Sequence, residues 1–203
     1  TARLVDDAGE VWGLAAGGVV PVLVDYGLPR VPRSVVVDAR MAKRPLDTRP
    51  DDAPLVVALG PGFVAGEDCH AVVETLRGSH MGRVLWEGST EPDTGTPAPV
   101  GGRTADRVLR APVDGTVGWD RRIGDLVEAG EVLGRVGDRE VTAPFDGLVR
   151  GLILDGIKVA SGTKVGDVDP RGKTASAHEV SDKALAVGGG VLEAVLTWLN
   201  RTG

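Results

Sequence analysis

Two stretches of this 203-residue chain repeat one another and decide its fold. Residues 111–136 read APVDGTVGWDRRIGDLVEAGEVLGRV, and residues 143–168 read APFDGLVRGLILDGIKVASGTKVGDV. The copies align without a gap at an offset of 143 − 111 = 32, and 10 of their 26 positions are identical. This agreement indicates an internal duplication, which has to be recognised before any secondary structure is assigned.

Each copy predicts short strands joined by tight turns. Asp-Gly and x-Gly pairs recur between short runs of valine and leucine, which is typical of hairpins and leaves no segment long enough for a helix. A copy of 26 residues is too small to close a core of its own. We therefore expect the copies to bury their apolar faces against each other around an approximate twofold axis, in one all-β domain over residues 103–169.

Residues 1–90, upstream of the duplication, favour an α/β layer instead. Three continuous apolar runs end in Asp or Gly, as strands that are covered on both faces do. These runs lie at residues 19–25, 35–38 and 55–60. Residues 84–86 predict a further strand, and residues 69–76 predict a helix of two or three turns. The predicted class is therefore α/β plus all-β, with a partial Rossmann-like layer first.

The remaining segments connect or cover these two domains. Residues 91–102 are rich in Pro, Gly and Thr and predict a linker. Within the C-terminal segment 170–203, residues 191–199 carry an apolar stripe at helical spacing, so we expect a helix that packs back on the α/β layer. Three glycines at 188–190 precede the stripe. They favour a close approach of another helix or of a ligand, with Gly189 as the candidate for ligand contact.

Charge and composition exclude several classes of function. The formal net charge is −6, from 23 basic and 29 acidic side chains, so we expect no DNA or RNA partner. Every apolar run is far shorter than the roughly 20 residues that a membrane-spanning helix needs, so we expect no membrane partner. A single cysteine, Cys69, and the lack of a signal segment favour the cytoplasm.

Basic residues crowd the segment that follows the second apolar run. Open α/β sheets bind ligands at the carboxyl ends of their strands, so Arg40, Lys43 and Arg44 predict a positive patch for a phosphate-bearing ligand. The turn with Gly60 and Gly62 follows the next strand and offers backbone N–H groups to the same anion. Solvated loop charge is the alternative explanation of the patch.

A second polar cluster lies farther along the chain. In a helix, His70 and Glu74 share a face, which makes them candidates for acid–base catalysis and for ligand binding. Arg77 is the candidate for binding a carboxylate or phosphate group of a ligand, and a turn at Gly78 brings His80 back to the same cluster. The spacing matches no standard zinc site, so we expect no metal. A hydrogen-bonded structural turn is the alternative to a ligand pocket.

The duplicated domain resembles the biotinyl/lipoyl family, whose fold is the barrel-sandwich hybrid. The resemblance lies in APVDG at residues 111–115 and GDLVEAG at residues 124–130. Carriers of that family hold a modified lysine on the hairpin between the halves, whereas residues 137–140 here read GDRE. The resemblance therefore implies a pseudo-twofold barrel-sandwich hybrid that carries neither biotin nor lipoate and serves for docking or covering.

Segments along nearly the whole chain resemble the YqeB-type family, which are accessory proteins of selenium-dependent molybdenum hydroxylases. The segments are DARMAKR at 38–44, LGPGFVAGEDCHAVVETLRG at 59–78, VLRAPVDG at 108–115, VGDVDPRG at 165–172 and SDKALAVGGGVLEA at 181–194. Members of the family normally begin with a Gly-rich Rossmann-like strand and turn. We expect this chain to lack that element, because nothing in it corresponds.

The resemblance implies a maturation factor for hydroxylases related to xanthine dehydrogenase, which handles or inserts the molybdenum cofactor (molybdopterin) or its selenium or sulfur ligand. The implied partners are the hydroxylase apoenzyme or other maturation factors. Cys69 is then a candidate relay thiol, with a small buried residue as the alternative. Two other functions stay open. One is an enzyme acting on the cofactor or a nucleotide, with His70, Glu74 or Cys69 as catalytic residues, and the other is a β-barrel docking module without a ligand.

Overall fold

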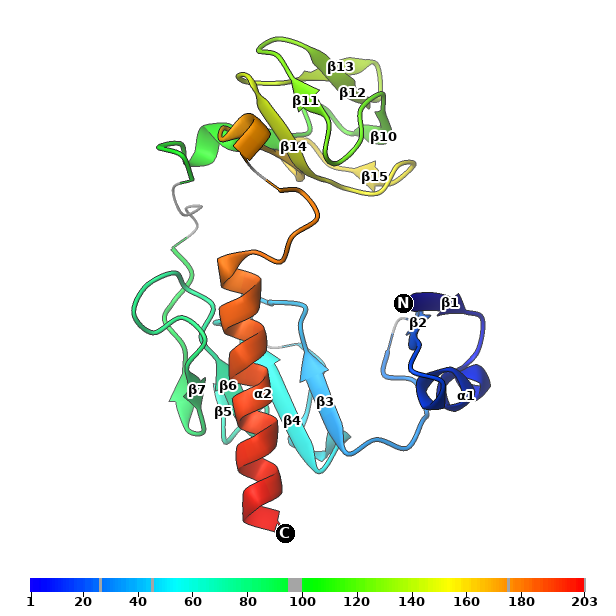
Figure 1. The fold of residues 1–203 in the computed structure, drawn as a ribbon, viewed down its shortest axis with the longest axis vertical. Coiled ribbons are helices and arrows are strands. Elements are labelled where there is room, and N and C mark those ends of the chain that lie inside the picture. The colour runs from blue at the N-terminus through cyan, green and yellow to red at the C-terminus, as the bar shows by residue number, and fades with distance from the viewer. Residues whose placement is uncertain (26, 45, 95–99, 175, 203) are drawn as a thin grey trace.

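The computed structural model describes residues 1–25, 27–44, 46–94, 100–174 and 176–202. Figure 1 shows two main bodies, an α/β body with the long C-terminal helix and a β body, and a small N-terminal unit beside the first. The mixture of α/β and β structure expected from the sequence is confirmed, with several sheets and few helices.

The duplicated segments build the β body. The first copy forms β10 (Gly115–Trp119), β11 (Leu126–Val127) and β12 (Val132–Val136). The second copy forms β14 (Gly147–Leu152), β15 (Lys158–Val159) and β16 (Lys164–Asp169). Strands β9 (Val108–Arg110) and β13 (Arg139–Thr142) precede the two copies. Corresponding strands of the copies start 147 − 115 = 32 residues apart, which is the offset of the sequence repeat.

The two copies exchange their short middle strands. One sheet has the order β13-β12-β10-β15 and the other has the order β11-β14-β16-β9. Strand β15 of the second copy thus pairs with β10, and β11 of the first copy pairs with β14. Side chains from both sheets, among them Leu133, Val136, Val149 and Val168, form one shared core. The copies therefore bury their apolar faces against each other, as the duplication predicts.

Glycine at equivalent positions of the copies allows a close backbone approach. An added Cβ at Gly115 would lie 2.6 Å from the backbone nitrogen of Gly137. An added Cβ at Gly147 would lie 2.6 Å from the carbonyl oxygen of Asp169. A close-packed interior leaves no room for such an atom, which explains why glycine recurs at this position in both copies.

A mixed four-stranded sheet forms the α/β body. Its strands, in spatial order, are β3 (Val35–Asp38), β4 (Leu55–Leu59), β6 (Ala71–Val73) and β7 (Val84–Leu85). The first three run parallel, and β7 runs antiparallel to β6. All five residues of β4 are buried, as the apolar run at 55–60 predicts. The carboxyl ends of β3, β4 and β6 therefore meet at one edge of the sheet.

The two faces of this sheet have different covers. Alternate residues of β4, at 55, 57 and 59, pack with helix α2 (Asp182–Thr202). The residues between them pack against Phe63 and Cys69, on the chain that joins β4 to β6. Two short strands of that side, β5 (Val64–Ala65) and β8 (Gly88–Ser89), pair with each other. The sheet thus has a helix on one face and loops on the other.

Two predicted elements of the α/β body are corrected. Residues 19–25 contain a strand, β2 (Val20–Leu23), but it is largely exposed and pairs with β1 (Ala2–Val5) in a separate small sheet beside α1 (Val11–Ala16). Residues 69–76 contain the strand β6 rather than a helix. The β-branched Val72 and Val73 suit a strand, and parallel pairing with β4 decides between the two structures.

Helix α2 packs on the sheet as expected but is longer than the apolar stripe. It begins at Asp182, next to Ser181, whose hydroxyl accepts a hydrogen bond from the nitrogen of Ala184 at 3.1 Å. It then continues through the three glycines along one face of the sheet (Figure 1). An added Cβ at Gly190 would overlap the backbone carbonyl group of Gly82 and lie 2.7 Å from a methyl carbon of Val73, so glycine lets the helix approach the sheet and the loop before β7.

Hydrogen bonds join the β body to the segment that leads to α2. Arg150 of β14 donates to the carbonyl oxygens of Ala177 and Glu179 at 2.6 and 3.3 Å, which ties the segment leading to α2 to the β body. The predicted linker 91–102 includes residues 95–99, which lie outside the described residues.

Single turns of 3-10 helix lie at Ala8–Glu10, Pro50–Asp52, Ala105–Arg107 and Gly172–Thr174. Within the described ranges, no helix combines the length and apolar composition that crossing a membrane requires.

The helix glycines predict opposite effects of the same substitution. Gly190→Ala inserts a methyl group against the backbone carbonyl of Gly82 and the side chain of Val73 and is expected to lower the free energy of unfolding by about 1–3 kcal/mol. Gly189 has open space around it. Gly189→Ala is therefore expected to raise the free energy of unfolding by about 0.5–1 kcal/mol, because alanine favours the helix. Urea unfolding followed by circular dichroism measures both, and equal effects would contradict the packing.

Candidate functional site

The carboxyl edge of the parallel strands collects most of the predicted site residues. Asp38 ends β3, Gly60 follows β4 and Glu74 follows β6. Since β3, β4 and β6 are neighbours in the sheet, the segments that leave them lie side by side. Ligands of open α/β sheets bind at such edges, which makes this edge the candidate functional site.

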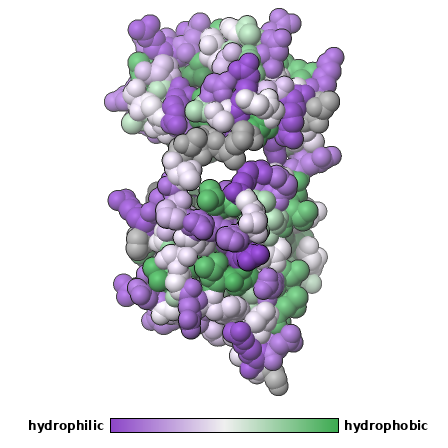
Figure 2. Space-filling view, turned by 90° about the vertical axis from the view of Figure 1, so that its left-hand side faces the viewer, coloured by the Kyte–Doolittle hydropathy of each residue, from purple (hydrophilic) through white to green (hydrophobic). Residues whose placement is uncertain are grey.

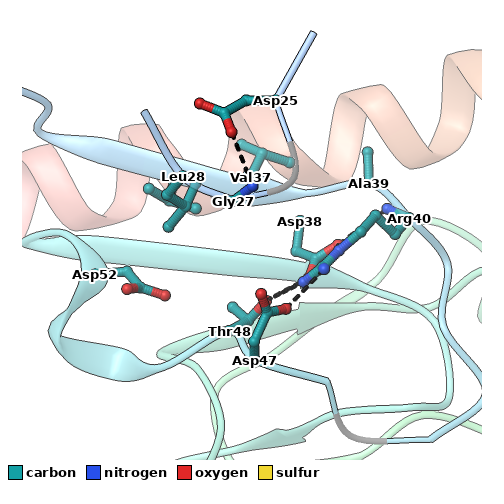
Figure 3. A pocket seen from close by; sticks show the side chains of 11 residues that line it. Asp25, Gly27, Leu28, Val37, Asp38, Ala39, Arg40, Asp47, Thr48 and Asp52 are labelled. Atoms are coloured by element: carbon teal, nitrogen blue, oxygen red, sulfur yellow. Dashed lines mark hydrogen bonds and ion pairs between the residues drawn. The ribbon is translucent and has the colours of Figure 1, made fainter. Parts of the chain in front are cut away.

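Arg40 is held by carboxylates on its own loop, as Figure 3 shows. Its Nε and Nη2 donate to Asp38 at 3.1 and 2.7 Å, and its Nη1 donates to Asp47 at 2.7 Å. The hydroxyl of Thr48 also donates to Asp38. Burial works to raise the pKa of Asp38, but the hydrogen bonds from Arg40 and Thr48 outweigh it and lower that pKa. Arg40 thus serves as the partner of a buried carboxylate.

A cavity of about 370 Å³ opens beside Arg40. Its lining includes the carboxylates of Asp25, Asp38, Asp47 and Asp52, so acidic groups outnumber the guanidinium. In Figure 3, Arg40 lies along Asp38 and Asp47, whereas Asp52 stands apart at the other end. A hollow with this balance of charge repels a phosphate.

The other cations predicted at the edge are neutralised in the same way, apart from the exposed Arg44. Lys43 forms an ion pair with Asp93, and both terminal nitrogens of Arg77 donate to Asp182 at the start of α2. The hydrogen bond from Arg77 lowers the pKa of Asp182 to about 2. Of the positive patch expected from Arg40, Lys43 and Arg44, the first two are therefore neutralised by ion pairs.

The glycine turn after β4 brings two loops together. Gly60 has a φ of +87°, which favours glycine, and an added Cβ there would lie 3.1 Å from the hydroxyl of Thr75. An added Cβ at Gly62 would overlap the backbone of Ala42 and Arg44. These contacts account for both glycines without an anion. Gly189, the third predicted glycine, lies on the exposed side of α2.

His70 and Glu74 both accept hydrogen bonds from the backbone. Nδ1 of His70 accepts from the nitrogen of Val56 at 2.9 Å. The buried carboxylate of Glu74 accepts from the nitrogens of Leu76 and Glu91, both at 2.7 Å. Because β6 separates the two residues, their positions are about 13 Å apart at the rise of an extended strand. The expected convergence of His70 and Glu74 on one helix face is therefore wrong.

Cys69 is a buried thiol. Its side chain is 1% exposed, and its Sγ donates a weak hydrogen bond to the carbonyl oxygen of Ala71 at 3.4 Å. Burial, together with the charge of Asp68, raises the pKa of Cys69 to about 11. A relay thiol needs access and a low pKa. Of the two interpretations of Cys69, this environment supports the small buried residue.

A second cavity near this edge is lined by two of the predicted site residues, Glu74 and His80. A cavity of about 450 Å³ around β7 takes in His80 together with Arg83 and Thr90. Neither Arg83 nor Thr90 belongs to a motif, so no local signal marks them. Nδ1 of His80 lies 3.9 Å from Oε1 of Glu91. In the described part of the chain, no group of three or more His, Cys, Asp or Glu side chains is placed to hold a metal ion.

These features define a protein with a duplicated β body and an α/β body whose sheet edge is closed by ion pairs. The chain is 47% identical over 204 residues to the uncharacterized protein YqeB of Escherichia coli (strain K12). The similarity covers 99% of this chain and 38% of that protein, so the chain spans well under half of its relative's length. No family model matches the chain.

Some solved structures resemble parts of the chain. An aspartoacylase family protein from Mesorhizobium loti has a TM-score of 0.30 and 19% identity, over 32% of this chain and 23% of that one. A succinylglutamate desuccinylase/aspartoacylase from Rhodobacter sphaeroides has a TM-score of 0.28 and 28% identity, over 32% of this chain and 22% of that one. The ectoine utilization protein EutE (DoeB) from Ruegeria pomeroyi has a TM-score of 0.30 and 26% identity, over 42% of this chain and 27% of that one. TM-scores this low carry no information on activity.

The environment of Cys69 predicts an unreactive thiol. A pKa raised from 9.0 to about 11 leaves about a hundredfold less thiolate at pH 8. Alkylation of the native protein by iodoacetamide at pH 8, followed by mass spectrometry, should be slower than in the urea-unfolded chain by at least that factor. Comparable rates in the two states would show that Cys69 is accessible and would restore the relay role.

The ion pair of Arg77 with Asp182 predicts an acid-sensitive attachment of α2. The pKa of Asp182 is lowered from 3.8 to about 2, so the pair stabilises the fold above about pH 4 and this stabilisation is lost as the pH falls through about 2. Asp182→Asn removes the pair at every pH. The two proteins should therefore differ in free energy of unfolding at pH 6 and converge near pH 2. Urea unfolding at each pH measures this, and a difference independent of pH would contradict the ion pair.

Proposed function

We propose that the chain acts as an accessory protein in the maturation of molybdenum hydroxylases related to xanthine dehydrogenase. It binds the hydroxylase apoenzyme or another maturation factor while the molybdenum cofactor, or its selenium or sulfur ligand, is put in place. The observation that carries this proposal is the resemblance of segments along nearly the whole chain to the YqeB-type accessory family, and the 47% identity to the uncharacterized protein YqeB of Escherichia coli along 99% of the chain supports that likeness. The segments that resemble the YqeB-type accessory family lie within that match.

The β body supports a docking task. Its duplicated halves and exchanged strands fit the barrel-sandwich hybrid that we propose for it, in line with its resemblance to biotinyl/lipoyl domains. The hairpin between β12 and β13 turns at Gly137 and Asp138 and contains no lysine. A carrier task needs that lysine, so we assign the body to docking or covering.

The environment of the candidate catalytic residues favours binding over catalysis. Nδ1 of His70 and both oxygens of Glu74 accept backbone hydrogen bonds, and Cys69 is buried. A general acid or base has to exchange a proton with its substrate. Groups that already hold the backbone are poorly placed to do so. The alternative of an enzyme acting on the cofactor or a nucleotide therefore finds no support in these three residues.

The residues expected to hold molybdopterin do not fit its phosphate. Arg40, Lys43 and Arg77 each face a carboxylate, and neighbouring loops close the turn at Gly60 and Gly62. A phosphate bound there would have to break these ion pairs and leave their carboxylates without partners. We therefore base the proposed function on protein docking and derive no cofactor step at this edge.

An apolar stripe on α2 supports docking of a protein partner. Leu185, Leu192, Leu196 and Leu199 are 50–70% exposed. Their spacing of seven, four and three residues places them on one face of the helix, away from the sheet. Exposed apolar patches mark protein interaction sites. Figure 2 shows that apolar side chains also gather on another side of the α/β body, whereas hydrophilic ones dominate on the β body.

A binding measurement with a molybdenum hydroxylase from the same organism tests the proposal. In biolayer interferometry, the purified chain should bind the cofactor-free hydroxylase and bind the cofactor-loaded form more weakly. The double variant Leu192→Glu with Leu196→Glu should weaken binding to the apoenzyme about tenfold or more, because two unpaired charges would enter the interface.

Leu154→Glu tests in the same measurement whether the β body takes part in the docking. Leu154 is 72% exposed and lies in the β body, between β14 and β15. If this variant loses binding while the helix variant keeps it, the docking surface lies on the β body and not on the apolar stripe of α2. If the unaltered chain binds no apoenzyme and no other maturation factor, the accessory function is refuted.

A further inference from the structure

Helix α2 carries a regular apolar seam on the face that points away from the sheet. Leu185, Leu192 and Leu199 recur every seven residues, and Gly189 and Leu196 lie between them. The steps along the seam therefore alternate between four and three residues, which is the spacing of the core positions of a coiled coil. All five residues are exposed, the leucines by 50–70%. The pattern indicates a helix that pairs with another helix.

The seam is separate from the residues that hold α2 on the sheet. The buried residues of the helix are Val187, Gly190 and Ala194, which lie about half a turn away from Leu192. Figure 1 shows α2 in front of the sheet, with none of the described elements drawn over its outer face. A second helix can therefore reach the seam while the packing of α2 on the sheet stays as it is.

The seam is complementary to itself when two copies of the helix run antiparallel. In a twofold pair, each contact between two different residues occurs twice. With the twofold axis between residues 190 and 191, Gly189 faces Leu192 of the second copy, and Leu185 faces Leu196 of the second copy. An added Cβ at Gly189 meets no atom within 4 Å, so the space above this glycine is open. The leucine of the second copy fills that space as a knob fills a hole.

Parallel pairing fits the seam less well. It would place the two copies of Gly189 opposite each other, and two residues without side chains leave a gap between layers of leucine, which costs stability. It would also bring the two β bodies together, because the first turn of α2 points to the β body in Figure 1. Antiparallel pairing sets the β bodies at opposite ends of the helix pair.

Charge favours the antiparallel pair as well. The positive end of each helix dipole lies beside the negative end of the other. Glu193 is the one charged residue between Lys183 and Arg201. In the same register it faces Gly188 of the second copy, which is exposed and leaves the carboxylate in contact with water. Like charges therefore do not meet across the seam.

The size of the seam indicates a weak and reversible dimer. A helix of 21 residues is about 30 Å long, and a strip about 10 Å wide along it covers roughly 300 Å². Stable interfaces between proteins bury about 800 Å² on each partner. The seam lies well below this value, so we expect association in the micromolar range or weaker.

We propose that a second copy of this chain covers the seam, with the two α2 helices antiparallel and Leu192 set against Gly189. The seam contains the stripe that the proposed function assigns to the hydroxylase apoenzyme. The dimer keeps this stripe covered until the apoenzyme displaces the second copy, a step that rests on the proposed function. The dimer itself is tested with this chain alone, so either proposal can fail without the other.

Sedimentation velocity of the full chain tests the dimer. The sedimentation coefficient should rise with concentration between about 2 and 200 µM, as mass action requires of a weak dimer. Leu192→Glu should weaken the association about tenfold or more, because it brings two charges into the apolar seam. Gly189→Leu should also weaken it about tenfold or more, although it makes the seam more apolar, because it fills the space that Leu192 of the second copy takes.

Leu154→Glu is the matched control for Leu192→Glu, because Leu154 is 72% exposed and lies in the β body. It should leave the association unchanged, and circular dichroism should be the same for all three variants. A chain that stays monomeric over the whole range would overturn the dimer and leave the stripe to the hydroxylase. An association that survives Leu192→Glu, or one that Gly189→Leu strengthens, would also overturn the pairing.

Disulfide crosslinking tests the direction of the two helices with the variants Leu185→Cys and Leu196→Cys. In the antiparallel pair the two positions are neighbours, so oxidation of an equal mixture should give a disulfide-linked dimer. Either variant alone should give none, because its two new thiols would lie about 16 Å apart along the helix, too far for a disulfide. The native Cys69 is buried and does not compete. A linked dimer from each variant alone would show parallel pairing and overturn the register.

Discussion

The burial of β4 is the constraint on which the α/β body depends. All five of its residues are buried, so one face has to be covered by α2 and the other by the loops that carry Phe63 and Cys69. Strands β3 and β6 pair with it in parallel and in fixed register. Asp38, Gly60 and Glu74 therefore leave the sheet side by side, and every ion pair of the edge starts from this arrangement.

The same Asp-x-Arg clamp closes a strand in each body. After β3, Nε of Arg40 donates to the two oxygens of Asp38 at 3.1 and 3.2 Å, and after β16, Arg171 donates likewise to Asp169 at 3.0 and 3.2 Å. In both clamps the backbone nitrogen of the arginine also donates to the aspartate carboxylate. A carboxylate at a buried strand end needs such a partner. The recurrence explains why basic residues after a strand misled the prediction of a phosphate site.

Local patterns predicted the β body, because its glycine turns recur at one offset in both copies. They also predicted β4, since a wholly apolar short run suits a buried strand. They failed for residues 69–76, where helical spacing and a short strand are both possible and only pairing with β4 decides. Arg77 and Asp182 are 105 residues apart, a separation that no single-sequence pattern bridges. The buried hydroxyl of Thr90 stands out only because it lacks a hydrogen-bond partner among the described residues, which is a property of the tertiary structure.

The strand exchange in the β body constrains how it is synthesised and degraded. Neither copy holds a complete sheet, because β11 finds its neighbour in the second copy and β15 finds its neighbour in the first. Contacts between distant parts of the chain have to form together, which makes folding slow and cooperative. A ribosome that has released only the first copy has therefore produced no stable intermediate. A protease that cuts between the copies likewise leaves no half able to persist alone.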